Sequence, residues 1–200
     1  SSGLEGAVPA AVMDRHRPHS LILVAALLQA LVAMQGRGWR PPRTLRFVAV
    51  GGARVAPALI DSARRGGLPV YEGYGLSECA SVVSLNTPAA DRPGSAGRPL
   101  PHLSVAVADG ELVVTHSGFL GYLGAPHGWQ PAGIRTGDLG HLDAGGYLHV
   151  HGRRDNLIVT AFGRNVSPEW VQAELLAGPP PQGAAGVGSG PGPCLALPRA

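Results

Sequence analysis

The segment from residue 45 to residue 78 constrains the fold most, because its pattern changes from strand to helix and back to strand. Leu45–Val50 is an apolar run that ends at Gly51–Gly52, as expected for a short strand followed by a tight turn. Pro57–Arg65 has proline in its first turn, where a helix tolerates the missing N–H. Leu68–Tyr71 is a second short strand that leads into a glycine-rich loop. This alternation predicts an α/β fold.

Upstream of that segment we expect one buried helix over Ser20–Gln35. Its residues are apolar on nearly every face, Ser20 is a suitable N-cap, and Gly36 and Gly38 follow its other end. The apolar stretch is shorter than the roughly 18 residues typical of a membrane span, and mixed residues precede it, so neither a membrane span nor a signal peptide is indicated. Residues 1–19 contain no signal for the start of an element.

The second half of the sequence predicts a small β-rich region. We expect strands at Val105–Val107, Glu111–Thr115 and Gly146–His151. Turns of the Asp-Gly or Gly-Gly type separate them at Asp109–Gly110 and Gly145–Gly146, since these residues adopt the backbone conformations that tight turns need.

The last part of the sequence predicts a further strand at Leu157–Thr160 and a helix at Pro168–Leu176 that Ser167 caps. Residues 178–200 are rich in proline, glycine and alanine, a composition that folds poorly.

Composition excludes several classes of protein. The 44% of hydrophobic residues suffices for a core, and the net charge of +3 comes from arginine alone, because the sequence contains no lysine. A basic balance can indicate a nucleic-acid surface, but these arginines are scattered with few aromatic residues among them, which favours a protein that does not bind nucleic acid. Cys79 and Cys194 have no zinc-ligand spacing, so we expect neither a zinc site nor a disulfide scaffold. We therefore expect the protein in a reducing cytoplasm.

The loop YEGYGLSE at Tyr71–Glu78 is the richest motif. Tyr74 lies between two glycines, where its ring can stack on a flat ligand or simply pack in a turn. Ser77 offers a hydroxyl to a phosphate, and Glu78 offers the hard oxygen that Mg²⁺ prefers. The earlier run Gly51–Ala53 (GGA) allows a ligand close to the backbone or forms only a tight turn. Neither a dinucleotide fingerprint nor a Walker phosphate loop is present.

Two further motifs carry charge. RTGDLG at Arg135–Gly140 places Asp138 between glycines, where its carboxylate can accept two hydrogen bonds from a ribose or shape a turn. GRRDNLI at Gly152–Ile158 contains Arg153, a fixed cation for ribose or phosphate oxygens or for a local ion pair. Asp155 follows it.

The order and spacing of these motifs, continued by GRNVSPE at Gly163–Glu169, resemble the adenylate-forming (AMP-binding) enzymes over roughly residues 20–176. The form YGLSE, together with LPVYEGYGLSE and RPGSAGRPLP, resembles the fatty-acyl branch of the acyl-CoA synthetases. The resemblance implies a partial large adenylation domain, a βα unit plus a small β-rich subdomain, over residues 1–154. It implies the truncated start of the small C-terminal domain over residues 155–200.

The resemblance also implies roles for individual residues. Ser77 would contact the α-phosphate and Glu78 would hold Mg²⁺, which makes these two the expected catalytic residues. Asp138 would bind the ribose hydroxyls, Arg153 would assist there, and Asp155 would be the hinge between the two domains. The adenine slot would be formed by Gly51, Gly52, Ala53, Glu72, Gly73 and Tyr74.

The implied activity is ATP-dependent, AMP-forming carboxylate–CoA ligation, with ATP, Mg²⁺ and coenzyme A as cofactors and co-substrates and a fatty or other apolar carboxylate as substrate. The lysine-closed phosphate loop and the C-terminal lysine of the family have no counterpart in these 200 residues, so we expect this chain to be inactive alone. Its partner would then be the remainder of such an enzyme. Two alternatives are a non-catalytic nucleotide-binding or interaction module derived from such an enzyme, and an α/β scaffold with coincidental motifs.

Other reactive side chains favour structural roles. Cys79 has no histidine near it in the sequence, so we expect packing rather than nucleophilic chemistry. His141, His149 and His151 alternate around a predicted strand, and we expect packed or exposed side chains rather than a metal site.

Overall fold

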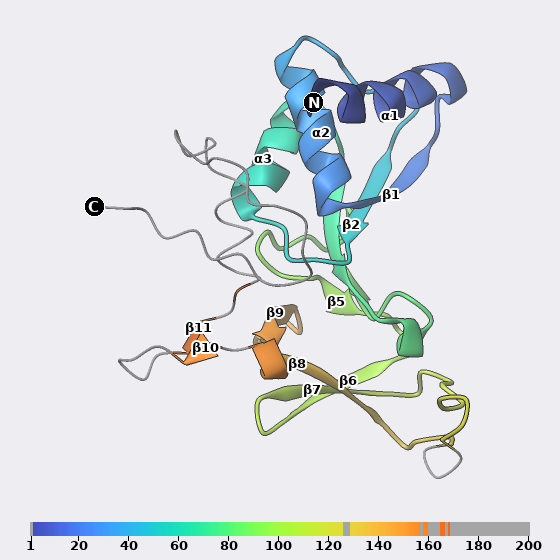
Figure 1. Ribbon diagram of the computed structural model, residues 1–200, viewed down its shortest axis with the longest axis vertical. Coiled ribbons are helices and arrows are strands. Elements are labelled where there is room, and N and C mark those ends of the chain that lie inside the picture. The colour runs from blue at the N-terminus through green and yellow to red at the C-terminus, as the bar shows by residue number, and fades with distance from the viewer. Residues whose placement is uncertain (1, 126–128, 157, 160–164, 167, 169–200) are drawn as a thin grey trace.

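The computed structural model describes residues 2–125, 129–156, 158–159, 165–166 and 168 of the chain. Within these residues a five-stranded sheet with the order β1-β2-β3-β4-β5 lies above a four-stranded sheet with the order β6-β7-β8-β9 (Figure 1). The helices gather around the five-stranded sheet, so the upper half is α/β and the lower half is β-rich. The predicted α/β fold class is confirmed.

The five-stranded sheet is parallel in its first part and antiparallel at its end. β1 (Ser20–Val24), β2 (Phe47–Gly51) and β3 (Val70–Tyr74) run parallel, and β4 (Ser84–Leu85) and β5 (Arg98–Pro99) continue the sheet antiparallel. The predicted strand–turn–helix–strand unit is therefore present. The strand β3, which follows the helix in this unit, extends to Tyr74. The first part of the YEGYGLSE motif therefore belongs to the sheet rather than to a loop.

In the described residues, the helices α2 (Ala25–Gly36) and α3 (Pro57–Arg65) pack on this sheet, and α1 (Ser2–His16) packs on α2. The bounds of α3 match the prediction, with Pro57 in the first turn. Helices and strands share one apolar core, since burying apolar area is the main stabilising contribution. Its largest fully buried side chains are Leu28, Leu31, Val48, Val50, Ile60, Leu68 and Val70.

The prediction of one helix over Ser20–Gln35 was wrong in its first part. Ser20–Val24 is a strand that pairs in parallel register with Phe47–Gly51, and the helix starts only at Ala25. Ser20 therefore caps nothing, and Val24 precedes the helix without a side-chain cap. An apolar run reads alike as buried strand and buried helix, so the neighbouring strand decided between them.

The helix α1 was also not predicted. It spans Ser2–His16 and contains Pro9. It packs on α2 through Ala10 and Met13, two apolar side chains of the core that are almost fully buried. Tertiary packing therefore stabilises a helix that local sequence signals do not predict.

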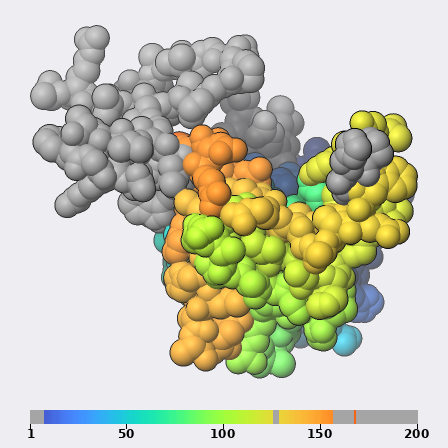
Figure 2. All heavy atoms as spheres, turned by 90° about the horizontal axis from the view of Figure 1, so that it is seen from below, coloured from blue at the N-terminus to red at the C-terminus, as the bar shows by residue number. Residues whose placement is uncertain are grey.

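The four-stranded sheet is antiparallel and consists of β6 (Ser104–Ala108), β7 (Glu111–Thr115), β8 (Ile134–Leu142) and β9 (Leu148–Arg153). Seen from below, it forms much of the near face, and the segment between β7 and β8 (yellow) projects at one side (Figure 2). The Asp109–Gly110 turn was predicted correctly, and both of its residues have positive φ, 53° and 77°.

The RTGDLG motif, for which the sequence left a turn open as one interpretation, lies within the strand β8. Gly137 has a φ of +74°, and the strand pairs irregularly with both neighbours, with register shifts between Glu111 and Val113 and between Leu139 and Gly140. Glycines within the motif read as a turn, whereas they allow bulges in a long strand.

The last described elements are short. The 3-10 turns η1 (Ser77–Cys79) and η3 (Arg154–Asn156) follow β3 and β9, and β10 (Ile158–Val159) pairs antiparallel with β11 (Asn165–Val166). The predicted strand at Leu157–Thr160 is thus described at its two central residues. Apart from Pro168, the predicted helix at 168–176 and the segment 178–200 lie outside the described residues. In the described part of the chain, no helix is long and apolar enough to cross a membrane.

Candidate functional site

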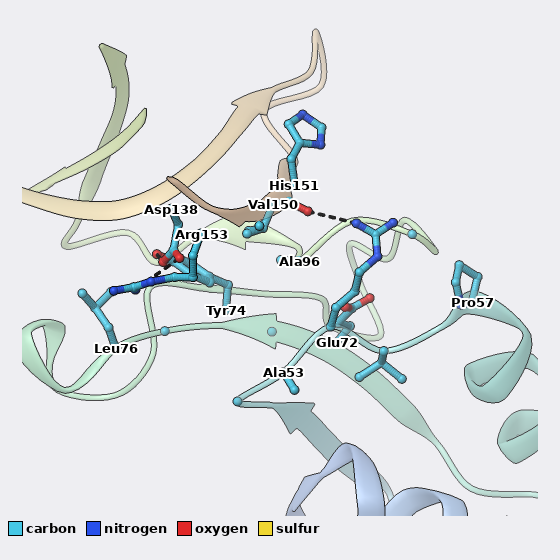
Figure 3. Close-up of a pocket in the computed structure, with 17 residues that line it drawn as sticks. Ala53, Pro57, Glu72, Tyr74, Leu76, Ala96, Asp138, Val150, His151 and Arg153 are labelled. Carbon is cyan, nitrogen blue, oxygen red and sulfur yellow. Dashed lines mark hydrogen bonds and ion pairs between the residues drawn. The ribbon is translucent and has the colours of Figure 1, made fainter. Parts of the chain in front are cut away.

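A cavity of about 270 Å³ lies where the two sheets meet. Its walls come from the turn after β2, from β3 and the loop behind it, from residues 94–96, and from β8 and β9 (Figure 3). It therefore unites motifs that lie far apart in the sequence. The predicted site residues in its lining are Gly52, Ala53, Glu72, Gly73, Tyr74, Asp138 and Arg153.

Four predicted site residues lie outside this lining. Gly51 is the last residue of β2, where an added Cβ would lie 2.9 Å from the carbonyl oxygen of Gly73. The close approach of β2 and β3 thus accounts for this glycine. Ser77 and Glu78 lie on η1, and Asp155 is exposed on η3.

Tyr74, Asp138 and Arg153 form a hydrogen-bonded group at one end of the cavity (Figure 3). The Tyr74 hydroxyl donates to Asp138 Oδ2 at 2.5 Å, and Arg153 Nη1 donates to Asp138 Oδ1 at 3.2 Å. Asp138 is only 7% exposed, and its backbone N–H donates to the Thr136 hydroxyl oxygen. Burial, followed by the hydrogen bond to Asp138, raises the pKa of Tyr74. The carboxylate is thus fixed at a position from which it can accept hydrogen bonds from a diol.

Glu72 and Arg54 also line the cavity, and Glu72 lies away from the group of Tyr74, Asp138 and Arg153 (Figure 3). Burial raises the pKa of Glu72 to about 7, against the opposing influence of a hydrogen bond with the Val55 backbone and the charge of Arg54. Arg54 Nη1 donates to the carbonyl oxygen of Val150 at 3.2 Å and so connects the two sheets. Sequence reasoning missed Arg54, although it directly follows the GGA motif, because a charged residue after a turn usually points to solvent.

Glu78 has a tyrosine partner that the sequence did not reveal. The hydroxyl of Tyr122, from the segment between β7 and β8, donates to Glu78 Oε1 at 2.5 Å. This hydrogen bond is the main reason that the pKa of Glu78 lies below its usual value, and the positive charge of Arg153 lowers it further. Glu78 is therefore a carboxylate that stays ionised close to the cavity.

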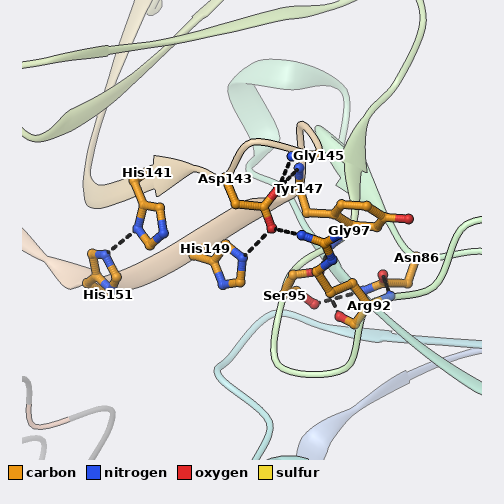
Figure 4. Close-up of polar contacts among 10 residues, drawn as sticks. All are labelled: Asn86, Arg92, Ser95, Gly97, His141, Asp143, Gly145, Tyr147, His149 and His151. Atoms are coloured by element: carbon orange, nitrogen blue, oxygen red, sulfur yellow. Dashed lines mark hydrogen bonds and ion pairs between the residues drawn. The ribbon is translucent and has the colours of Figure 1, made fainter.

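A polar network around the turn between β8 and β9 supports the cavity wall (Figure 4). Asp143 accepts hydrogen bonds from Arg92, from His149 Nε2 at 3.1 Å and from the backbone of Tyr147. Partial burial opposes ionisation of Asp143, but these hydrogen bonds outweigh it and lower its pKa. Asn86 in turn binds the backbone at Glu72, Arg92 and Ser95. This network fixes the segment that contributes Gly94 and Ala96 to the lining.

The three histidines lie together on the same sheet. His141 stacks on His149 at 4.8 Å between ring centroids and on His151 at 5.0 Å, and His141 Nδ1 lies 2.9 Å from His151 Nε2. Across the residues that the structure describes, no group of three or more His, Cys, Asp or Glu side chains is arranged to hold a metal ion.

Cys79 lies in a second apolar cluster. It is 2% exposed and packs with Val83, Leu103, Val114 and Ile134. Burial raises the pKa of its thiol. The predicted packing role is confirmed, since a buried thiol of raised pKa is a poor nucleophile.

The fold matches part of the adenylation domain of adenylate-forming enzymes. The family model described as "AMP-binding enzyme" matches residues 3–123, and the chain belongs to this family, within the adenylate-forming superfamily. The resemblance inferred from the motifs is therefore confirmed.

The relatives by sequence are acyl-CoA ligases. The chain is 36% identical over 175 residues to the 2-succinylbenzoate–CoA ligase of Geobacillus kaustophilus, covering 78% of this chain and 35% of the relative. It is 37% identical over 140 residues to a long-chain-fatty-acid–CoA ligase of Mycobacterium bovis, covering 67% of this chain and 23% of the relative. The chain thus spans about a third or less of the length of these relatives.

Solved structures give the same result. The O-succinylbenzoate coenzyme A synthetase of Bacillus subtilis, in complex with ATP and a magnesium ion, matches with a TM-score of 0.70 and 28% identity, over 86% of this chain and 39% of that one. The anthranilate CoA ligase AuaEII, in complex with anthranoyl-AMP, matches with a TM-score of 0.77 over 87% of this chain and 37% of that one. Its 22% identity supports the fold alone.

Proposed function

We propose that this chain provides the adenine- and ribose-binding wall of an AMP-forming carboxylate–CoA ligase and binds ATP or AMP in the cavity between its two sheets. The observation that carries the proposal is the group of Tyr74, Asp138 and Arg153. Three motifs from positions far apart converge on one cavity, and they supply an aromatic ring, a fixed carboxylate and a cation.

The two ends of the cavity fit the two parts of a nucleoside. Gly52, Ala53 and Gly73 expose backbone without bulky side chains, which admits a flat base beside the ring of Tyr74. Asp138 and Arg153 suit the ribose hydroxyls, because a carboxylate accepts their hydrogen bonds and a guanidinium donates to their oxygens. Glu72 and Arg54 complete the base end.

Magnesium fits the donor chemistry at Glu78. The carboxylate is held ionised by Tyr122 and Arg153, and hard oxygen donors are the ligands that Mg²⁺ prefers. When bound, the ion would neutralise negative charge on the phosphates of ATP. Ser77 is exposed beside it and would donate its hydroxyl to a phosphate oxygen.

Calorimetry tests the nucleotide-binding proposal. We expect AMP and ATP to bind weakly, and Asp138→Ala to weaken binding about tenfold, the usual effect of losing hydrogen bonds to a charged group. Asp61→Ala is the matched control, since Asp61 is an exposed aspartate on α3 away from the cavity. Absence of binding by the unmodified chain, or equal affinity in the Asp138→Ala variant, would refute the proposal.

We further propose that the 200-residue chain does not form an acyl-adenylate alone. It has no lysine and no phosphate loop, and arginine does not replace a compact ammonium group freely. Carboxylate-dependent pyrophosphate exchange should therefore be absent with apolar carboxylates, including 2-succinylbenzoate and long-chain fatty acids, the substrates that the names of the relatives give. Robust exchange by the purified chain would contradict this.

The remainder of such an enzyme is the partner that the exposed edge of the five-stranded sheet supports. Ile22 is 85% exposed and Val24 is 52% exposed on β1, the outermost strand, although parallel sheets normally have both faces covered. The division into residues 1–154 and 155–200 with a hinge at Asp155, and a cytoplasmic location, stay predictions. Limited proteolysis with cleavage clustered near residue 155 would support the division.

The alternative, a non-catalytic nucleotide-binding or interaction module, is favoured by the absence of lysine. Adding a polypeptide that corresponds to the missing part of a 2-succinylbenzoate–CoA ligase separates the two proposals. Restored pyrophosphate exchange favours the ligase, and nucleotide binding without exchange favours the module.

A further inference from the structure

Tyr122 is a tyrosine whose position burial does not explain. Its side chain is 60% exposed, and it lies on the segment between β7 and β8 that projects at one side of the molecule (Figure 2). A tyrosine on such a segment normally keeps its hydroxyl in water. Here the hydroxyl instead donates to Glu78 Oε1 at 2.5 Å, across 44 positions of the sequence.

The segment around Tyr122 is fixed in place by one ring contact and by backbone hydrogen bonds. Phe119 meets the Tyr122 ring edge to face at 5.1 Å between centroids and packs against the apolar cluster that contains Cys79, the neighbour of Glu78. Backbone hydrogen bonds from Ala125 to Tyr122 and from Gln130 to Leu120 close the segment on itself. The phenol is therefore anchored near Glu78 by contacts that do not depend on the hydrogen bond itself.

A donor that holds one oxygen of a carboxylate fixes the direction in which the other oxygen points. Ligands of metal ions commonly have such partners, which set the orientation of the ligand before the ion arrives. The phenol suits this task, because it donates one hydrogen bond and brings no positive charge that would compete with a cation. Arg153, the nearby cation, is instead directed to Asp138 and the carbonyl oxygen of Thr136.

We propose that Tyr122 is a positioning residue for Glu78: its hydroxyl holds Oε1 and so presents the remaining oxygen to a nucleotide-bound Mg²⁺. This inference rests on the proposed function, in which Glu78 is the magnesium ligand. It assigns to the exposed segment between β7 and β8 a role in metal affinity that its sequence does not announce.

The test compares ATP affinity without Mg²⁺, in the presence of a chelator, with ATP affinity at saturating Mg²⁺, both by calorimetry on the full 200-residue chain. The affinity with Mg²⁺ divided by the affinity without it gives a ratio that measures the contribution of the metal separately from nucleotide binding. Tyr122→Phe keeps the ring and its contact with Phe119 and removes only the donor, so we expect an unchanged Mg²⁺-free affinity and a ratio about tenfold lower. Leu123→Ala, a fully exposed residue of the same segment, should leave both affinities unchanged.

Glu78→Gln separates this inference from the proposed function. If Glu78→Gln abolishes the Mg²⁺ effect while Tyr122→Phe preserves it, the metal ligand stands and the positioning role is wrong. A Tyr122→Phe ratio above that of the unmodified chain also overturns the inference, because Tyr122 would then compete with the metal for Glu78. If neither variant alters the ratio but Asp138→Ala still weakens ATP binding, the role of Glu78 and the positioning role both fail and the nucleotide site remains.

Discussion

The two halves of the molecule shift the pKa of a glutamate in opposite directions. Glu72, in the α/β half, has its pKa raised to about 7 because burial outweighs the nearby Val55 backbone and Arg54. Glu111, in the four-stranded sheet, is 3% exposed, yet its pKa is lowered, first by a hydrogen bond from the Gly137 backbone. The α/β half is organised by apolar packing and offers an ion little compensation, whereas the β half surrounds its carboxylate with donors.

This difference explains how one cavity acquires two kinds of wall. The α/β half contributes backbone, glycines and an aromatic ring, which suit a flat and weakly polar base. The β half contributes Asp138, whose position depends on Thr136 and, through the adjoining Gly137, on Glu111. In this cavity the glycines and the aromatic ring therefore come from the α/β half, and the hydrogen-bonded carboxylate of Asp138 comes from the β half.

The largest effect is expected where backbone packing in the α/β half allows no side chain. A Cβ at Gly75 would lie 1.5 Å from the carbonyl oxygen of Ser81, so Gly75→Ala should lower the free energy of unfolding by about 4 kcal/mol, the range of the most damaging substitutions. Urea unfolding measures this. Gly36→Ala is the control, because a Cβ there has nothing within 4 Å, and it should stay within about 1 kcal/mol of the unmodified chain. A loss below 1 kcal/mol for Gly75→Ala would contradict the packing argument.

The next effect concerns charge in the β half. Glu111 accepts hydrogen bonds from Arg135 and from the backbone N–H of Gly137, so Glu111→Gln should cost about 2 kcal/mol at pH 7. Because the folded pKa is lowered, the stabilisation is complete above the unfolded pKa of about 4.5 and is lost as the pH falls through the folded pKa. Urea unfolding at pH 7 and pH 3 should therefore show a smaller difference at pH 3. Exposed Asp61 supplies the control, and Asp61→Asn should leave the free energy of unfolding unchanged at both pH values.

Sequence reasoning predicted the elements whose local signals agree with their surroundings. Pro57 marked the start of α3 correctly, and the Asp109–Gly110 turn placed β6 and β7. It was wrong at Ser20–Val24 and missed β8, because an apolar run and a glycine-containing motif take their structure from the strand beside them. Pairing partners are distant in sequence, so propensity could not supply them.

The candidate site divides in the same way. Motif order was enough to name Tyr74, Asp138 and Arg153, which the fold brings together. Arg54 and Tyr122 could not be named, because their significance lies in contacts with Val150 and Glu78 that only the folded chain creates. Which motif residues lie together could therefore be predicted from the sequence, whereas contacts that form only between the two sheets could not.

The contribution of Glu72 to stability should depend on pH in the opposite direction to that of Glu111. The folded state of Glu72 binds a proton between about pH 4.5 and pH 7 that the unfolded state has released, so stability falls as the pH rises through this window and stays lower above it. Glu72→Gln removes the ionised form, and the variant should exceed the unmodified chain by on the order of 1 kcal/mol at pH 8 and equal it near pH 4. Urea unfolding at both pH values checks this, and a destabilised variant at pH 8 would show that Glu72 is compensated as Glu111 is.

The smallest effect shows which donors give the β half its character. Arg154 contacts Glu111 at 3.1 Å, but its side chain is 42% exposed, so Arg154→Ala should cost only about 0.5 kcal/mol, as exposed ion pairs do. Glu111 keeps its partly buried hydrogen bond from the Gly137 backbone in this variant, and salt screens that bond less than it screens an exposed ion pair. Urea unfolding with and without 0.5 M salt tests this, because that concentration is roughly fivefold above the about 0.1 M scale of surface screening. The salt should abolish the loss of stability in Arg154→Ala and leave most of the loss in Glu111→Gln. A loss of 2 kcal/mol on Arg154→Ala would instead assign the stability of this sheet to exposed charge, and the contrast between a packed half and an internally hydrogen-bonded half would not hold.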